Sequence, residues 1–453
     1  MNKKFIFIGA GALVLILIIV LVATSCGGTK QPVVAGSNTL TIWGFDDPTL
    51  YGDVISDFQT KNPTYKVTYV KKDPADYETA ALSEIAAGKG PDVWAIPNNW
   101  VPKFQDKLVA MPSTLIANKK AKKTNIEVYK TLFPNVVAQD NIIGDNIYGM
   151  PLSIDTLVLF YNKKILNKTV NDYFAAGNKD VGGVIGQKFA QGPINWDDFV
   201  TMTKLITKKD GKNITQSAVA LGTSGNVNQA TDILTLLMMQ DGAKMTSDDL
   251  STAQFHTKQN VFGGQDFPGA QALNFYTAFA NPQTDLYTWN SSIEDSLHAF
   301  AEGKTAMMID YTSQEAEVTR INPNLSFNYF AMPQVKETKN EVNYASYMTF
   351  TVTKASKAPN IAWQFINSLT NSNKTPSYVS KMKKQPVQLV AITANSKEGK
   401  RILNAQDWYN PDPAKIKTIF SDSIQQVNDG KNPQTAIEYA GSQITTLLGK
   451  LKQ

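Results

Sequence analysis

Residues 39–70 read TLTIWGFDDPTLYGDVISDFQTKNPTYKVTYV, and this stretch decides the fold. Residues 39–44 form a β-rich run that ends at a glycine. Apolar residues then recur at helical spacing over 49–60, and 65–70 alternates again as a strand. Strand, helix and strand in succession favour an α/β fold with a mostly parallel sheet.

The same alternation continues along the chain. A helix is expected at 75–87, where Gly88-Lys89-Gly90-Pro91 stops it, followed by a short strand at 92–96. Further strands are expected at 157–161, 306–310 and 347–352, and helices at 196–207, 230–240, 270–280, 293–302, 361–370, 416–427 and 434–450. Segments 167–192 and 208–215, rich in Asn, Gly and Lys, are expected as surface loops. About 415 residues of this pattern exceed one typical core, which predicts two lobes.

Composition excludes several classes of protein. The 453 residues carry 44 Lys plus Arg against 39 Asp plus Glu, a formal charge of +5. This mild charge does not indicate a nucleic-acid-binding protein. With two histidines (His256 and His298) and one cysteine (Cys26), zinc sites and disulfide frameworks are excluded. Nucleophile-elbow, zinc-protease and phosphate-loop motifs are absent from the sequence, so we expect no cofactor, no metal and no catalysis.

The N-terminal 25 residues read as a signal peptide or a membrane anchor. Lys3 and Lys4 precede an apolar stretch over 5–22, long enough as a helix to reach ~27 Å. The run Ala23-Thr24-Ser25-Cys26 resembles a bacterial lipoprotein signal, which implies acylation of Cys26; an uncleaved helix is the alternative. Either reading, with 26–37 as a tether, places the rest at the extracellular face of the cell membrane.

Four further motifs carry a resemblance to a known family. They are the strand and turn Leu40–Gly44, the helix-to-strand step Ala87–Val93, the segment Tyr148–Leu157 running on to Lys163, and the step Phe300–Met308. In this order and spacing, they resemble the extracellular solute-binding proteins of ABC importers, in the cluster that includes maltose-binding protein. The resemblance covers nearly all of residues 38–450.

The resemblance implies a two-lobed, type II periplasmic-binding-protein-like fold with a hinge between the lobes. It implies an N-terminal lobe of 38–150 plus 350–386 and a C-terminal lobe of 151–349 plus 387–453. Ligand is then expected in the cleft between the lobes, with hinge closure as the signal. The implied partners are the permease subunits of an ABC transporter and a small solute, bound by a monomer that takes no nucleic acid.

A sugar site needs aromatic faces for the C–H faces of the ring, and carboxylates or amides for the hydroxyl groups. The candidate ligand residues of these two kinds follow expected strands, precede helices or lie at crossovers. They are Trp43, Asp46, Asn99, Trp100, Asp155, Asn228, Trp289, Tyr311, Tyr344, Tyr347 and Trp408. Packing within one lobe or capping of a helix is the alternative role for each of them. Trp94, Trp196 and Trp363 lie in apolar-periodic stretches and are expected in the core.

The expected ligand is a mono- or oligosaccharide, and a polyamine or another solute is the alternative. Two other functions stay open at this point. A sensor or adhesion module could use the same fold without a permease. An anchored glycoside hydrolase needs only two suitably placed carboxylates, which 39 acidic residues could supply.

Overall fold

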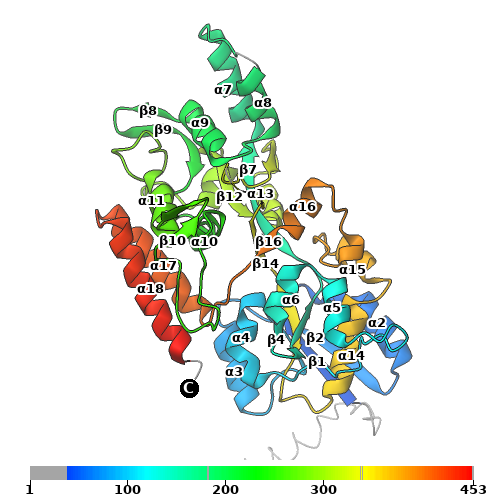
Figure 1. The fold of residues 1–453 in the computed structure, drawn as a ribbon. Coiled ribbons are helices and arrows are strands. Elements are labelled where there is room, and N and C mark those ends of the chain that lie inside the picture. Colours follow the sequence, from blue (N-terminus) through cyan, green and yellow to red (C-terminus); the bar gives the residue numbers. More distant parts are fainter. Residues whose placement is uncertain (1–37, 181–182, 337, 339, 451–453) are drawn as a thin grey trace, which may run out of the picture.

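The computed structural model describes residues 38–180, 183–336, 338 and 340–450. Each of its two lobes is a β-sheet flanked by helices, so the α/β class with two lobes is confirmed (Figure 1). The predictions for residues 1–37, including Cys26, lie outside the described residues. Among the helices of the described ranges, none combines the length and apolar character that crossing a bilayer requires.

The N-terminal lobe, at the bottom of Figure 1, is built on a five-stranded sheet. Its strand order is β2 (Tyr65–Lys71), β1 (Asn38–Gly44), β3 (Val93–Pro97), β15 (Met348–Val352) and β6 (Gly149–Pro151). The first three strands are parallel, and β15 runs antiparallel to both of its neighbours. The flanking helices are α2 (Gly52–Lys61), α3 (Tyr77–Ala86), α4 (Val101–Phe104), α5 (Asn125–Leu132), α6 (Asn135–Asn141), α14 (Pro359–Thr370) and α15 (Thr375–Lys381).

The C-terminal lobe, at the top of Figure 1, is built on a larger and more mixed sheet. Its order is β16 (Ala405–Gln406), β14 (Asn343–Ser346), β7 (Asp155–Asn162), β12 (Thr305–Tyr311), β9 (Asn213–Ala220) and β8 (Lys208–Asp210), with β13 (Phe327–Phe330) also on β7. Strand β7 is antiparallel to β12, β13 and β14. The expectation of a mostly parallel sheet therefore fits the N-terminal lobe better than this one.

Ten helices described in the C-terminal lobe surround this sheet. They are α7 (Lys163–Ala175), α8 (Val184–Gln191), α9 (Trp196–Ile206), α10 (Ala230–Gln240), α11 (Pro268–Ala278), α12 (Ser296–Ala301), α13 (Glu315–Ile321), α16 (Lys397–Leu403), α17 (Pro413–Asn428) and α18 (Pro433–Lys450). The long pair α17 and α18 runs down the left side of Figure 1 towards α3 of the other lobe.

Two predicted loops are wrong. Segment 167–192 contains most of α7 and all of α8, which project from the top of Figure 1. Asn162 caps α7 by accepting from the N–H of Lys164, and Leu166 and Thr169 bury one side of the helix. Segment 208–215 lies in the β8–β9 hairpin. Polar composition suggested loops there, but capping and hairpin pairing decide the local structure.

Each lobe has its own core. Trp363 lies on α14 in the core of the N-terminal lobe, and Trp196 lies in that of the C-terminal lobe. Where the end of β1 pairs with the start of β3, a smaller cluster contains Trp43, Tyr77 and Trp94. The prediction of core positions for Trp94, Trp196 and Trp363 is confirmed, since each exposes at most 9% of its surface.

The chain passes between the sheets three times. Residues 152–154 join β6 to β7, and Tyr347 alone separates β14 from β15. The third passage lies between α15 and β16, where the Ile154 N–H donates to the Gln385 carbonyl at 3.1 Å. These passages lie side by side, so the segments that follow them come together between the lobes.

Candidate functional site

The turn after β3 is held against a crossover. Residues 98–100 form a single 3₁₀ turn before α4. The Asn98 N–H donates to the Tyr347 carbonyl at 2.9 Å, and the Tyr347 N–H donates to the Asn98 side-chain oxygen at 3.2 Å. This reciprocal pair fixes the Asn98 amide with its NH₂ group pointing away from Tyr347.

The Asn98 amide joins the two lobes. Its nitrogen donates to Asp140 Oδ2 on α6 at 3.0 Å and to Asp407 Oδ2 after β16 at 2.7 Å. The neighbouring Gln139 amide donates to the Asp407 carbonyl at 3.0 Å. Asn98, Asp140 and Asp407 each expose 9% of their surface or less. The contact is therefore a buried polar bridge that must be remade whenever the lobes move apart and return.

Burial dominates the electrostatics of this bridge. It raises the pKa of Asp140 to about 6, against which the hydroxyl of Tyr347 donates at 2.6 Å. It raises the pKa of Asp407 well above its usual range, and the negative charge of Asp140 raises it further. A buried carboxyl group that has a second carboxyl group as its neighbour keeps its proton to a higher pH than an exposed one.

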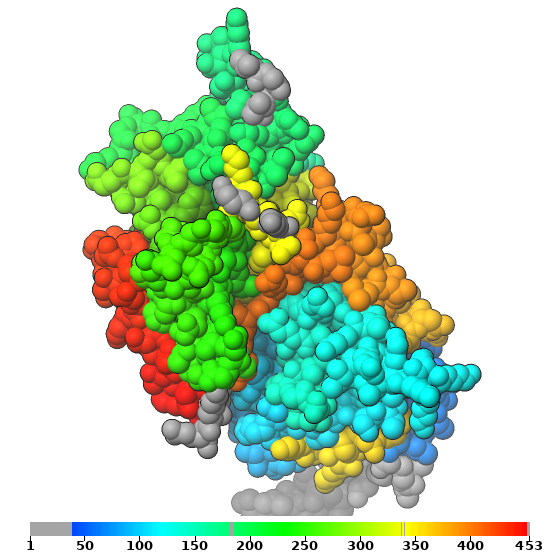
Figure 2. Space-filling view, in the orientation of Figure 1, coloured from blue at the N-terminus to red at the C-terminus, as the bar shows by residue number. Residues whose placement is uncertain are grey.

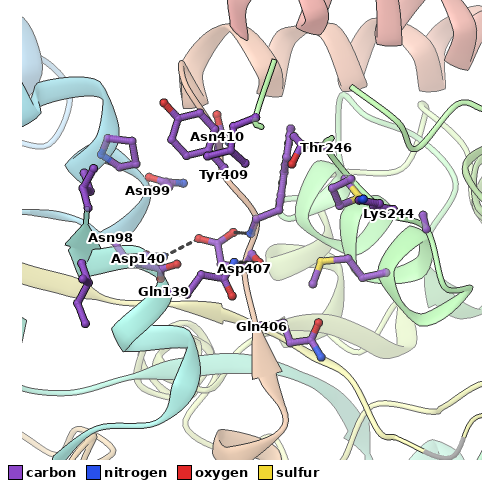
Figure 3. A pocket seen from close by; sticks show the side chains of 18 of the residues that line it. Asn98, Asn99, Gln139, Asp140, Lys244, Thr246, Gln406, Asp407, Tyr409 and Asn410 are labelled. Carbon is purple, nitrogen blue, oxygen red and sulfur yellow. Dashed lines mark hydrogen bonds between the residues drawn. The ribbon is translucent and has the colours of Figure 1, made fainter. Parts of the chain in front are cut away.

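A cavity of about 470 Å³, here called the amide cavity, lies above the bridge. Figure 3 shows Asn98, Gln139 and Asp140 of the N-terminal lobe on one side, Lys244 and Thr246 on the other, and the segment after β16 between them. Most of the lining residues labelled there carry amide or carboxyl groups: Asn98, Asn99, Gln139, Asp140, Gln406, Asp407 and Asn410. The other labelled residues are Lys244, Thr246 and Tyr409. On the face seen in Figure 2, a groove separates the two lobes beside the green surface of residues 240–250.

A second cavity of about 310 Å³, here called the aromatic cavity, lies on the other side of the same segment. Trp100 of the N-terminal lobe and Trp408, Tyr344 and Phe420 of the C-terminal lobe line it. Its charged lining residues are Glu78, Asp232 and Lys417. Asn99, Trp408 and Asn410 line both cavities, so the two adjoin.

Asp232 is a partly buried acid of the aromatic cavity. Burial raises its pKa, while the hydroxyl of Tyr311, which donates to Asp232 Oδ2 at 2.6 Å, and the charge of Lys417 oppose the rise. A carboxyl in this position can accept a hydrogen bond from a ligand hydroxyl through its second oxygen.

Two amide oxygens at the cavities are buried and have no hydrogen-bond donor. They are Oδ1 of Asn99, from the N-terminal lobe, and Oδ1 of Asn410, from the C-terminal lobe. Buried acceptors are normally satisfied by protein or water, so each of these can take a donor from a bound molecule. One acceptor from each lobe faces the same region between the lobes.

The structure brings together several of the predicted ligand residues. Asn99, Trp100, Tyr344 and Trp408 line the aromatic cavity. Tyr311 lies directly behind it, bonded to Asp232. Tyr347 lies below the amide cavity, bonded to Asp140.

Three other predicted residues are engaged within their surroundings. Trp43 is 6% exposed, with Lys72 Nζ 3.7 Å from its ring centroid. Asp46 binds Lys384 Nζ at 2.7 Å and accepts from the Tyr51 hydroxyl at 2.8 Å. Asp155 accepts from the N–H groups of Thr312 and Ser313, so it caps the turn after β12.

Asn228 and Trp289 lie apart from both cavities. Asn228 is exposed in the turn before α10. Trp289 is fully buried and donates its indole N–H to Asn226 at 3.1 Å, so it packs in the C-terminal core and presents no face to the cleft. The Asn226 side chain also donates to the carbonyls of Asn290 and Ile293, which ties its turn to the segment that follows Trp289.

Sequence analysis missed four polar residues of this region: Asn98, Asp140, Asp232 and Asp407. Asn98 and Asp407 adjoin predicted residues, and this adjacency is the one signal that could have found them. Asp140 and Asp232 lie on helices and carry no local mark of burial. Among the described residues, no group of three or more His, Cys, Asp or Glu side chains could hold a metal ion.

Residues 46–373 match the family model described as bacterial extracellular solute-binding protein. A galactooligosaccharide-binding protein of Bacillus subtilis is 22% identical over 417 residues, which cover 88% of this chain and 86% of the relative.

Solved structures of this kind share the fold. A solute-binding protein of an ABC transporter from Thermotoga lettingae, bound with alpha-D-tagatose, superposes with a TM-score of 0.66 at 22% identity, covering 91% of this chain and 100% of that one. The sugar-binding protein MalE from Xanthomonas citri gives a TM-score of 0.70 at 17% identity, covering 92% and 98%. These neighbours are binding proteins, and at these identities they show the fold alone.

Proposed function

Since this chain belongs to the bacterial extracellular solute-binding proteins, we propose that it is the solute receptor of an ABC importer and binds a mono- or oligosaccharide in the aromatic cavity. The observation that carries the proposal is the pairing of Trp100 and Trp408. They come from opposite lobes and line one cavity together with Asn99 and Asp232. Indole faces cover the C–H face of a sugar ring, and amide and carboxyl oxygens accept from its hydroxyl groups.

The unpartnered oxygens of Asn99 and Asn410 support a ligand rich in hydroxyl donors. A sugar that donates to both would touch both lobes at once. Such a ligand favours the closed arrangement by its differential affinity for that state. The permease of the importer would then receive the closed form, and the free energy of transport would come from its ATPase.

A ligand screen tests the proposal. The whole chain in non-ionic detergent is heated with single mono- and oligosaccharides, and with polyamines as the competing class. A sugar at ~100 times its dissociation constant should add ~2.7 kcal/mol of stability. The Trp100→Ala variant should lose the response, and Tyr409→Ala, in the amide cavity, should keep it. A response to polyamines alone would replace the sugar with a cation as the ligand.

The proposal includes attachment to the outer face of the cell membrane through Cys26, acylated after removal of residues 1–25. The run before Cys26 supports it. Growth with radioactive palmitate should label the wild-type chain but not Cys26→Ser. Labelling of neither, with the chain still in the membrane fraction, would indicate an uncleaved N-terminal helix instead.

We propose that the bound sugar is released unchanged. Glu78 and Asp232 line the aromatic cavity and are the carboxyl pair that a hydrolase reading would use. Oligosaccharides found in the screen should therefore give no new reducing ends over prolonged incubation. Hydrolysis that is lost in Asp232→Asn with binding retained would establish the hydrolase instead.

A further inference from the structure

The chain contains two arginines, and their side chains differ in exposure and in their partners. Arg320 is exposed on α13, where its Nε donates to Glu317 at 2.8 Å. Arg401 lies on α16 and is 7% exposed. Within the described residues, the side chain of Arg401 makes neither an ion pair nor a hydrogen bond, and its Nη1 is buried without a partner. A buried guanidinium without an acceptor is unusual, because burial of a charge is costly unless it is paired.

An aromatic ring covers the face of the Arg401 guanidinium, but no acceptor among the described residues bonds to the N–H groups at its edges. The ring of Tyr329 lies 5.5 Å from it. Glu398 and Asp155 act on Arg401 through their charge, but neither forms an ion pair with it within the described residues. Asp155 accepts from Thr312 and Ser313, and Glu341 accepts from Asn404 at 3.0 Å. The ring contact offsets part of the burial cost, but it cannot accept from the N–H groups that point along the edge of the plane.

Two small cavities adjoin this guanidinium. They measure about 200 and 210 Å³, and both are lined by Arg401 and Lys397. Lys400 lines the first, and Glu398 lines the second. Residues 397, 400 and 401 are three and four positions apart, so they share one face of α16. Within the described residues, Lys397 and Lys400 are exposed and form no ion pair.

We propose that these joined cavities bind a small anion that presents a carboxylate or a phosphate group to Arg401. The planar guanidinium would supply paired N–H donors along one edge, and Lys397 and Lys400 would supply charge at the entrance. At roughly 30 Å³ per water molecule, either cavity has room for an anion of the size of acetate or phosphate. They share no lining residue with the amide or the aromatic cavity, so the site is separate from the proposed sugar site.

Selective isotope labelling tests the site directly, because only two arginine side chains can give signals. The whole chain, labelled with ¹⁵N-arginine, is titrated with sodium phosphate, sodium acetate or sodium chloride at equal ionic strength. Arg320→Gln and Arg401→Gln assign the two Nε–H signals. We expect the Arg401 signal to move saturably with phosphate or acetate, while the Arg320 signal stays in place. Which of the two anions saturates it identifies the group that binds.

A second measurement avoids dependence on the fold of an Arg401 variant. Equilibrium dialysis with radioactive phosphate or acetate compares Lys397→Gln/Lys400→Gln with Lys354→Gln/Lys357→Gln, a matched pair of exposed lysines on the other lobe. We expect the first pair to weaken binding at least fivefold and the second to leave it unchanged. An Arg401 signal that does not move, that moves equally with chloride, or that moves in step with Arg320 would overturn the proposal, as would equal effects of the two lysine pairs.

Discussion

The amide cavity and the aromatic cavity lie on two sides of the same segment, yet their walls differ in kind. Amides, two carboxyl groups and aliphatic side chains line the first, and the Asn98 bridge adjoins it. Indole, phenol and phenyl rings line much of the second, with two acids and a lysine. Aromatic rings provide contact surface for a ligand. The hydrogen bonds of the Asn98 bridge instead depend on the position of one lobe relative to the other. The comparison suggests that one cavity recognises the solute and the other responds to the hinge.

The largest expected effect tests the amide side through pH. The folded pKa of Asp140, about 6, lies above the ordinary value of 3.8. The folded state therefore binds the Asp140 proton more tightly than the unfolded state does. The free energy of unfolding that this proton contributes is fully present below pH ~4 and is lost as the pH rises through 6. At ~1.4 kcal/mol per pH unit, the loss reaches about 3 kcal/mol. Asp140→Asn should thus come close to wild type at pH 3.5 and exceed it by up to that amount at pH 7.5 in urea unfolding.

Asp145→Asn is the matched control for this prediction, because Asp145 is exposed in the nearby turn between β4 (Ile142–Ile143) and β5 (Asn146–Ile147). Its difference from wild type should not change between the two pH values. An Asp140→Asn variant that is equally destabilised at both pH values would show that the carboxyl is held as an ion.

The next effect tests the aromatic side. Trp100→Ala removes the ring that the N-terminal lobe contributes, and loss of a central aromatic contact should weaken sugar binding by about 2 kcal/mol, or ~30-fold. Isothermal titration with the sugar from the screen measures it. Tyr409→Ala is the control from the amide cavity and should change the affinity less than twofold. Equal losses in both variants would mean that the ligand spans both cavities.

How far the sequence predicts this arrangement depends on the range of the contacts involved. Strand, helix and strand over 39–70 appear as β1, α2 and β2 because local periodicity specifies them. A cleft position for Asn99 and Trp100 could be predicted because they follow a predicted strand, and both line the aromatic cavity. Asp155 reads as a free acid in the sequence, but its acceptor capacity is used by Thr312, 157 residues away. The hydrogen bond between Asn98 and Asp407 joins residues 309 positions apart, and no local sequence pattern predicts it.

A smaller effect compares two buried phenols, one on each side. Tyr347 donates to Asp140 and Tyr311 donates to Asp232, each at 2.6 Å. Tyr347→Phe should lower the free energy of unfolding by about 1–2 kcal/mol, because a buried carboxyl loses its donor. Tyr311→Phe should also lower the affinity for sugar, since Asp232 lines the aromatic cavity. Thermal unfolding and titration calorimetry on both variants separate the two sides.

The smallest effect concerns an ion pair between the lobes. Lys103 of α4 binds Glu78 at 2.6 Å and reaches Asp412, before α17, at 3.4 Å. Lys103→Met should weaken the contact between the lobes by about 0.5 kcal/mol. The affinity for sugar should then fall two- to threefold. The difference should shrink in 1 M salt. Lys107→Met, which removes only a pair with the adjacent Asp106, should behave as wild type.

The burial of the tryptophans has a spectroscopic consequence. All seven lie in the described residues, and six expose 9% of their surface or less, which leaves Trp100 as the half-buried one. A neutral collisional quencher such as acrylamide therefore reaches the emission of this protein chiefly through Trp100. A solute that covers this ring would protect its emission from the quencher. Occupancy of the aromatic cavity can therefore be followed in the unlabelled wild-type chain, as a lower slope of the quenching plot.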